Sequence, residues 1–265
     1  MPVIQGLGWT FDTVASTYEK LRPGYVAELY DSLFAYCPLN ESSHAIEVGI
    51  GGGQATKPVL DTGCTVTAVE PGENFCALCK DKFAAYPGFS VINGKFEDVD
   101  LPESSFDLVY SASAFHWVPE EEGYQKVFRI LKSGGAFARF ANHPHPDKGR
   151  PELTEEIDRL YGEYYNAYHK RSIGKPTPYS EEAARSRAEI AAKYGFTDIR
   201  WAMFYRTRTF TAAEYIRLLG TYSDHIAIDE DTRNRFFGGI EAAINRHGGL
   251  FTLYDTIDLQ LARKP

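Results

Sequence analysis

A glycine-rich stretch that follows an acidic residue is the part of this sequence best suited to bind a nucleotide-like ligand. Residues 45–56 read AIEVGIGGGQAT, so that Glu47, Gly49, Gly51 and Gly53 alternate after a short apolar run. Glycine permits positive φ and lets the backbone approach a ligand closely. An acid just before the first glycine is wrong for a pyrophosphate, whereas it suits an ammonium group or a sugar hydroxyl. The stretch therefore predicts a ligand that carries one of those groups.

A second acid, Glu70, ends the next apolar run, TVTAVE. A carboxylate at the end of a second strand, about 20 residues after the glycines, is placed to accept hydrogen bonds from ribose hydroxyls. The dinucleotide pattern G-x-G-x-x-G/A fails, because Gln54 or Thr56 occupies its third glycine position, and the G-K-[ST] of a phosphate loop is absent. The alternatives are a plain strand-to-helix turn for the glycines and a solvated acid for Glu70.

His116 is the candidate for acid–base chemistry. It lies in AFHWV, directly after the apolar run FDLVYSA. Imidazole titrates near neutral pH, and open α/β sheets bind ligands at the carboxyl ends of their strands. The alternative is that His116 packs locally beside Trp117.

Two pairs of residues have spacings that could bind a metal, and we expect no metal site. His143 and His145 in NHPHP are a thin ligand set on their own. Cys76 and Cys79 form C-x-x-C, but no second pair follows at zinc-site spacing. We expect ordinary packed thiols.

Strand and helix patterns alternate from residue 44 onward, which predicts a parallel sheet with helices on both faces. Short apolar or β-branched runs bounded by turn residues predict strands, and apolar residues three and four apart predict helices. Residues 211–214, TAAE, form a capping box that opens a helix. The expected strands are 44–48, 65–70, 89–92, 106–112, 135–140, 197–210 and 250–263, and the expected helices include 73–85, 119–131, 151–170, 181–194 and 230–246.

The whole chain is expected to form one domain, 1–265, with a helical cap at 1–35 and a helical insertion at 143–193. The insertion begins with a loop, NHPHPDKGRP, and its tyrosines at 157–168 have helical spacing. These aromatics could roof a substrate pocket as a lid, or could form core. Trp9 and Phe11 could close the other side of the cleft.

Composition excludes several classes of protein. Of the 265 residues 43% are hydrophobic, the formal charge is −8, and no long basic run occurs. Nucleic acids and membrane surfaces attract a positive face, so we expect neither as a partner. No apolar run approaches the roughly 20 residues that cross a bilayer, and the first residues do not resemble a signal peptide. The expected location is the cytoplasm, and the oligomeric state is left open.

The sequence resembles the class I S-adenosylmethionine-dependent methyltransferases. Their signature, E-x-G-x-G-x-G with an acid ending the second strand, matches Glu47 to Gly53 with Glu70. NGKFEDVDLPESSFDLVYSASAFHWV and LKSGGAFARF resemble that family's third to fifth strands, and FDTVASTYEKLRPGY resembles the entry helix of its small-molecule branch, which includes trans-aconitate methyltransferase. The match covers residues 11–140 and more weakly the last 70, and Lys95 departs from it. The resemblance implies a Rossmann-like, doubly wound sheet of seven strands, mostly parallel with the last strand antiparallel.

The resemblance also implies a role for each matching residue. The glycines would line the methionine part of the cofactor, Glu47 would lie near its amino group, and Glu70 would bind both ribose hydroxyls. Phe96 and Glu97 would border adenine, and Ser111 would face the amino end or the sulfonium. Tyr18 and Arg22 would cover the cofactor, with Arg22 free to pair with a carboxylate. The expected cofactor-binding residues are Tyr18, Arg22, Glu47, Gly49, Gly51, Gly53, Gln54, Glu70, Pro71, Phe96, Glu97 and Ser111.

The implied activity is transfer of a methyl group from S-adenosylmethionine to a small molecule, with O-methylation favoured. The displacement needs position and desolvation more than acid–base help, so His116 would act as a base only if the nucleophile must lose a proton. A carboxylic acid, a phenol and an amine are all possible acceptors. The rival hypotheses are a catalytically silent S-adenosylmethionine-binding protein and a nicotinamide-dependent oxidoreductase.

Overall fold

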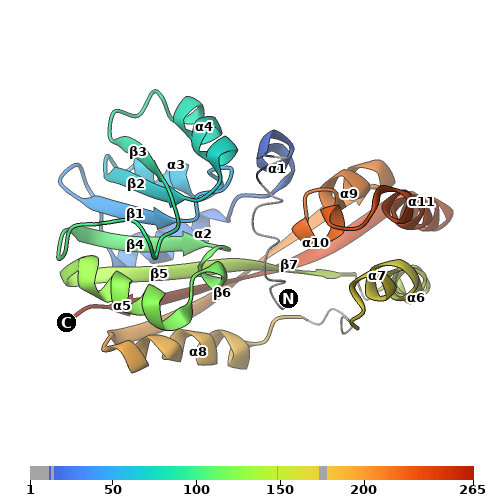
Figure 1. Ribbon diagram of the computed structural model, residues 1–265. Coiled ribbons are helices and arrows are strands. Elements are labelled where there is room, and N and C mark those ends of the chain that lie inside the picture. The colour runs from blue at the N-terminus through green and yellow to red at the C-terminus, as the bar shows by residue number, and fades with distance from the viewer. Residues whose placement is uncertain (1–11, 13–14, 148, 173–177) are drawn as a thin grey trace.

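One mixed β-sheet organises the chain. The structure is a computed structural model that describes residues 12, 15–147, 149–172 and 178–265. In those residues the sheet has seven strands in the order β3-β2-β1-β4-β5-β7-β6 (Figure 1). The strands are β1 (His44–Val48), β2 (Thr65–Glu70), β3 (Phe89–Asn93), β4 (Phe106–Ala112), β5 (Leu131–Pro146), β6 (Thr197–Thr211) and β7 (Leu250–Arg263).

The strand directions confirm the predicted sheet. β1 pairs in parallel with β2 and β4, β2 with β3, and β4 with β5. β7 is antiparallel to both of its neighbours, β5 and β6. The carboxyl ends of the parallel strands therefore share one edge of the sheet, which is where open α/β sheets bind ligands.

Helices cover both faces of the sheet, as expected for a doubly wound fold. On one face a buried cluster includes residues of α2 (Ala27–Tyr36), α3 (Thr56–Leu60) and α4 (Glu73–Lys82). On the other face the cluster includes residues of α5 (Glu120–Ile130) and η4 (Ile190–Tyr194). Because α2 belongs to this layer, only α1 (Ala15–Leu21) in the described part of the predicted cap at 1–35 lies outside the two layers.

A third buried cluster lies beyond the end of the parallel strands. It combines α6 (Pro151–Leu160), α9 (Ala212–Leu219) and α11 (Glu230–Arg246) with the first residues of β7. Figure 1 shows these helices, with α7 (Ala167–His169) and α10 (Ser223–Ile226), gathered at the far ends of the long strands and away from α4. The three longest strands, β5, β6 and β7, thus connect the sheet to a second helical core.

Residues 142–146 correct the prediction of a loop. They continue β5 and pair with β7, from Asn142 opposite Ile257 to Pro146 opposite Leu253. The pairing of β4 with β5 ends at Ala112 opposite Phe140, so the extension of β5 is bonded on one side only. Prolines are tolerated on such an edge because the missing N–H is not needed there.

The predicted helical insertion at 143–193 divides between the two cores. α6 and a π-helical segment, η3 (Tyr161–Asn166), pack against α11, whereas α8 (Glu181–Glu189) contacts β6 and β7. Tyr165 is fully buried, and Tyr161 and Tyr164 pack against the same cluster. Of the two readings for these tyrosines, core is therefore the one that the packing favours, while a lid role stays a prediction.

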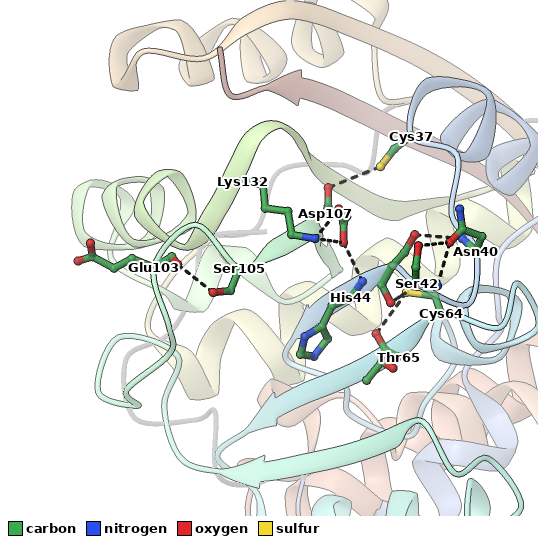
Figure 2. Close-up of polar contacts among 11 residues, drawn as sticks. Cys37, Asn40, Ser42, His44, Cys64, Thr65, Glu103, Ser105, Asp107 and Lys132 are labelled. Carbon is green, nitrogen blue, oxygen red and sulfur yellow. Dashed lines mark hydrogen bonds and ion pairs between the residues drawn. The ribbon is translucent and has the colours of Figure 1, made fainter.

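A polar cluster fastens the opposite, amino end of the parallel strands (Figure 2). The Asp107 carboxylate accepts hydrogen bonds from the His44 backbone N–H at 2.9 Å and from Lys132 Nζ at 2.9 and 2.8 Å. The same residue's carbonyl accepts from Cys37 Sγ at 3.6 Å. Asp107 therefore links the starts of β1, β4 and β5 at the edge that does not carry the glycine loop.

We predict that Asp107→Ala lowers the free energy of unfolding by about 1–2 kcal/mol, because two charge-assisted hydrogen bonds are lost. Lys132→Met should cost about 0–1 kcal/mol, since the Lys132 side chain is 41% exposed and its ion pair is solvated. Urea unfolding of both variants tests the order. Equal losses would show that the bond to the His44 backbone adds nothing.

Candidate functional site

The loop after β1 has a backbone that only glycine adopts easily. Gly49, Gly51 and Gly53 have φ of +74°, +51° and +71°. A Cβ on Gly49 would lie 2.4 Å from Ala114 Cβ, and one on Gly53 would lie 2.6 Å from the Phe83 ring. The alternating glycines therefore serve both turn geometry and close packing.

Glu70 closes this loop against the end of β2. Its Oε2 accepts from the Gly51 N–H and its Oε1 from the Gly72 N–H, both at 2.9 Å. The side chain is buried, and burial raises the pKa of its carboxyl while the two backbone hydrogen bonds lower it. Each oxygen keeps a free lone pair, so the carboxylate can also accept from two neighbouring hydroxyls.

Glu47 and Gln54 each keep a buried polar atom without a partner among the described residues. Glu47 Oε2 accepts from Thr56 Oγ1 and from the Tyr110 hydroxyl, both at 2.7 Å, whereas Oε1 has no partner. Burial raises the pKa of Glu47 to about 7 against the effect of those two hydrogen bonds. Gln54 Nε2 is likewise buried and unpaired. The loop thus offers one acceptor for an ammonium group and one donor for a carboxylate.

A cleft of about 510 Å³ opens at the ends of β2 and β3. Pro71, one of the residues expected to bind the cofactor, lines it. The other lining residues are Asp12, Glu73, Asn74, Asn93, Gly94 and Lys95.

Sequence reasoning missed Asn93, although a signal was present. Asn93 pairs with Glu70 in register, and its Nδ2 donates to the carbonyls of Glu70 and Pro71 at 3.0 Å each. Asn93 ends the third strand, as Glu70 ends the second, and a polar residue at that position could have been predicted to lie at the same edge of the sheet. Asp12 and Asn74 gave no such signal, because they meet only in the folded chain, where the Asp12 carboxylate accepts from the Asn74 and Phe75 N–H groups at 3.3 and 3.0 Å.

Two predicted residues point differently from the expectation. Phe96 is buried in the core and packs on Phe115 at a ring distance of 6.5 Å, so its side chain does not border the cleft. Glu97 is half-buried, its carbonyl accepts from Lys126 Nζ at 3.1 Å, and it is not among the residues that line the cleft.

The Ser111 hydroxyl is engaged within the sheet, and its predicted role beside the cofactor stays a prediction. Ser111 is buried, and its hydroxyl donates to the Val48 carbonyl at 2.8 Å. Side chains alternate along β4, and Tyr110 rather than Ser111 points to the face that carries Glu47. Ser113, with φ of +56°, instead lies beyond the strand end and shares a 2.9 Å hydrogen bond with the Tyr25 hydroxyl.

α1 lies over the glycine loop. The Tyr18 ring comes within 3.7 Å of a Cβ built on Gly51 and meets Phe75 edge-on. Lys82 Nζ bonds both Glu19 Oε1 at 2.8 Å and the Gly52 carbonyl at 2.9 Å. Tyr18 therefore lies beside the loop, and its role in covering the cofactor stays a prediction. Trp9 and Phe11 lie outside the described residues.

Arg22 is engaged elsewhere than predicted. Its Nε donates to Thr221 Oγ1 at 3.0 Å and its Nη2 to the Thr221 carbonyl at 3.1 Å. The guanidinium lies 3.8 Å from the Tyr222 ring centroid and 5.0 Å from that of Tyr18. Nε and Nη2 already donate to Thr221, so pairing with a ligand carboxylate would have to use the remaining N–H groups of the guanidinium.

His116 lies in a short helical turn, η2 (Phe115–Trp117), after β4. Its side chain is exposed, and its ring packs on Trp117 at 5.1 Å. Desolvation by the surrounding chain and the charges of Arg187 and Arg139 lower its pKa to about 4. The lowered pKa leaves the imidazole neutral and weakly basic at pH 7.

The two pairs considered for metals have other partners. His143 Nε2 bonds Asp258 Oδ1 at 2.9 Å, and its ring stacks on Tyr179 at 3.7 Å. In the part of the chain that the structure describes, no three His, Cys, Asp or Glu side chains gather to hold a metal. Cys76 and Cys79 are buried free thiols.

Comparison with known proteins gives a consistent result. Residues 46–138 match the family described as a methyltransferase domain. An uncharacterized methyltransferase of Schizosaccharomyces pombe is 27% identical over 82% of this chain and 80% of its own. Another, of Bacillus cytotoxicus, is 31% identical over 57% of this chain and 74% of its own. A solved structure from Anaeromyxobacter dehalogenans, a candidate type II methyltransferase, covers 91% of this chain and 97% of its own with a TM-score of 0.63 and 21% identity, and so shows the same fold. None of the described helices has the length and apolar character to span a membrane.

We predict that Gly49→Ala lowers the free energy of unfolding by about 2–4 kcal/mol, from positive φ and collision with Ala114 together. Gly134→Ala is the matched control, because Gly134 has φ of +79° and a Cβ there meets nothing within 4 Å. The control should cost about 1–2 kcal/mol. Chemical denaturation measures both, and equal losses would contradict the collision.

Glu47 should make stability fall as pH rises. Its folded pKa of about 7 lies above the ordinary value of 4.5, so the folded state binds the extra proton between those values. The free energy of unfolding should therefore drop between pH 4.5 and about 7, by at most about 3 kcal/mol. Glu47→Gln mimics the protonated carboxyl and should remove this dependence. A pH series of unfolding midpoints with the same slope in both proteins would contradict the assignment.

Proposed function

Because the chain belongs to the class I S-adenosylmethionine-dependent methyltransferases, we propose that it methylates an oxygen of a small acidic molecule. The methyl donor, S-adenosylmethionine, would bind along the glycine loop and the adjoining cleft. The observation that carries this placement is the set of buried atoms without partners beside the bridging carboxylate of Glu70.

The residues present fit the cofactor group by group. The ammonium of its methionine part would meet Glu47 Oε1, and the carboxylate would meet Gln54 Nε2. The ribose hydroxyls would donate to the lone pairs that Glu70 has left, and adenine would occupy the cleft lined by Pro71 and Asn93. An ammonium beside Glu47 would favour its charged form, so cofactor affinity should rise with pH through about 7.

The protein's part in the reaction is position and exclusion of water. S-adenosylmethionine supplies a methyl group activated on a sulfonium, which an acceptor oxygen displaces in line. The acceptor would lie over the carboxyl ends of β4 and β5, beside Ser113 and the Tyr25 hydroxyl. Burial raises the pKa of Tyr25 above its ordinary range, so its phenol would act there as a neutral donor.

Two features support an acceptor that is already an anion at neutral pH. His116, with a pKa near 4, is too weak a base to activate a phenol, whose pKa is about 10, but a carboxylate needs no base. Arg206 and Arg208 both bind the buried carboxylate of Asp255, so one of their two positive charges is not neutralised and could attract an anionic acceptor. Arg206 also donates to the Gly24 carbonyl at 2.9 Å. His116 would then orient the acceptor, or act as base only for other substrates.

The second candidate is a protein that binds the cofactor without transferring its methyl group. The same buried atoms at Glu47 and Gln54 would serve it, because they concern binding alone. Turnover separates the two candidates.

We expect calorimetry to show micromolar binding of S-adenosylmethionine and S-adenosylhomocysteine, and no binding of NAD. Glu70→Ala should weaken that binding about 100-fold, because two hydrogen bonds to a carboxylate are lost. Glu103→Ala is the control, since the Glu103 side chain is 72% exposed and lies at the other end of the strands. Binding of NAD, or unchanged binding in Glu70→Ala, would sink the proposed site.

The acceptor is tested by release of S-adenosylhomocysteine from equimolar panels of di- and tricarboxylic acids, phenols and amines. Turnover confined to the acids, with an alkali-labile methyl ester as product, is the expected result. Turnover of phenols or amines would overturn the acidic acceptor. Binding without any turnover would favour the silent protein.

A further inference from the structure

We propose that Arg22 is a positioning residue that couples cofactor binding to the helices of the second core. The inference rests on the proposed cofactor site at the glycine loop. It concerns the connection between α1, which covers that loop, and the turn that joins α9 to α10.

α1 stands between the two halves of the molecule. It contacts α4 on one side and α9 on the other, and Figure 1 shows it between them. Toward the loop, a Cβ on Gly52 would lie 3.0 Å from Glu19 Cα, so that the helix backbone presses on the glycines. Toward the second core, Leu21 packs against the buried cluster of α6, α9 and α11. A ligand that holds the loop and α1 together therefore also fixes the end of α1.

Arg22 is the polar link at that end, and its hydrogen bonds have one defined direction. Thr221 is fully buried, and its hydroxyl hydrogen is used by the Leu218 carbonyl at 2.6 Å. Its oxygen is thereby left to accept from Arg22 Nε, while the Thr221 carbonyl accepts from Nη2. The guanidinium also lies over the rings of Tyr222 and Tyr18, at 3.8 and 5.0 Å from their centroids. The fork requires a guanidinium, because a lysine ammonium presents no two parallel N–H groups.

The turn that Arg22 holds continues into a hydrogen-bonded network. The Tyr222 ring lies 5.5 Å from that of His225, which bonds Asp224 Oδ1 through Nδ1 at 2.8 Å. The Tyr161 hydroxyl lies 3.0 Å from His225 Nε2, and the Tyr165 hydroxyl donates to Asp224 Oδ2 at 2.5 Å. Because Asp224 must accept, His225 carries its proton on Nδ1 and accepts from Tyr161. The π-helical segment η3 is thus tied to α10 as one unit.

These contacts form a continuous path from the cofactor loop to η3. Movement of α1 away from the loop, to admit or release the cofactor, must break the two hydrogen bonds from Arg22 to Thr221. It must also separate the guanidinium from the Tyr222 ring. Conversely, a bound cofactor that holds Tyr18 and α1 on the loop holds Arg22 on Thr221. The second core, to which Tyr161 and Tyr165 belong, is then ordered by the cofactor.

The test is hydrogen exchange with S-adenosylhomocysteine as the probe, in wild type, Arg22→Met and Thr221→Val. Saturating ligand should slow exchange at residues 49–54 and at 219–226 in wild type. In Arg22→Met the slowing at 49–54 should persist and that at 219–226 should be lost, and the ligand should dissociate about tenfold faster. Thr221→Val keeps the shape but removes both the acceptor for Arg22 Nε and the donor to the Leu218 carbonyl, while the Thr221 carbonyl still accepts from Arg22 Nη2. It should change both quantities in the same direction by less.

Arg200→Met is the matched control. Arg200 is also stacked, 5.1 Å from the Tyr36 ring, and bonded to Asp198, but it lies far from the loop at the amino end of β6. It should behave as wild type. Slowing at 219–226 that persists in ligand-bound Arg22→Met, or that is missing in ligand-bound wild type, would overturn the coupling. Failure of wild type to bind the probe would instead overturn the cofactor site itself, and the coupling with it.

Discussion

The carboxylate of Glu70 is the constraint on which the site depends. One side chain at the end of β2 accepts the N–H groups of Gly51 and Gly72, and so holds the glycine loop and the start of α4 to the same point. The loop reaches this carboxylate because Gly49, Gly51 and Gly53 adopt positive φ without Cβ atoms. The same carboxylate retains lone pairs that can accept from hydroxyls. The group that holds the loop is therefore also the group proposed to bind the ribose.

The buried charges around the loop follow from this compact arrangement. Glu47 lies one strand away, is deprived of water, and has its pKa raised to about 7 with one oxygen unpaired. A buried acceptor without a partner is costly in the free protein and is satisfied when a donor arrives. The unpaired Glu47 oxygen therefore lowers the stability of the free protein and prepares a site for an ammonium group. Local destabilisation of this kind is common at binding sites.

The long strands place the second helical core next to the glycine loop. β5 and β7 stay paired beyond the end of β4, and this extension carries a second core onto the side of the sheet where the loop opens. α1 then fills the space between α4 and α9, which brings Arg22 to Thr221, a residue 199 positions away. The N-terminal helix is consequently shared by the glycine loop and the helices of the second core.

The sequence alone was enough for features whose causes are local. The glycine loop with its two acids, the order of strands and helices, and the capping box of Thr211 and Glu214 all depend on residues a few positions apart. Tertiary packing decided the rest. Ser111 turned to Val48 because of its register in β4, residues 142–146 became a strand because β7 lies beside them, and Arg22 found Thr221 because α1 docks between two cores. Each of these outcomes depends on partners more than 60 residues away, and such pairings are set by the packing of whole elements rather than by any short pattern.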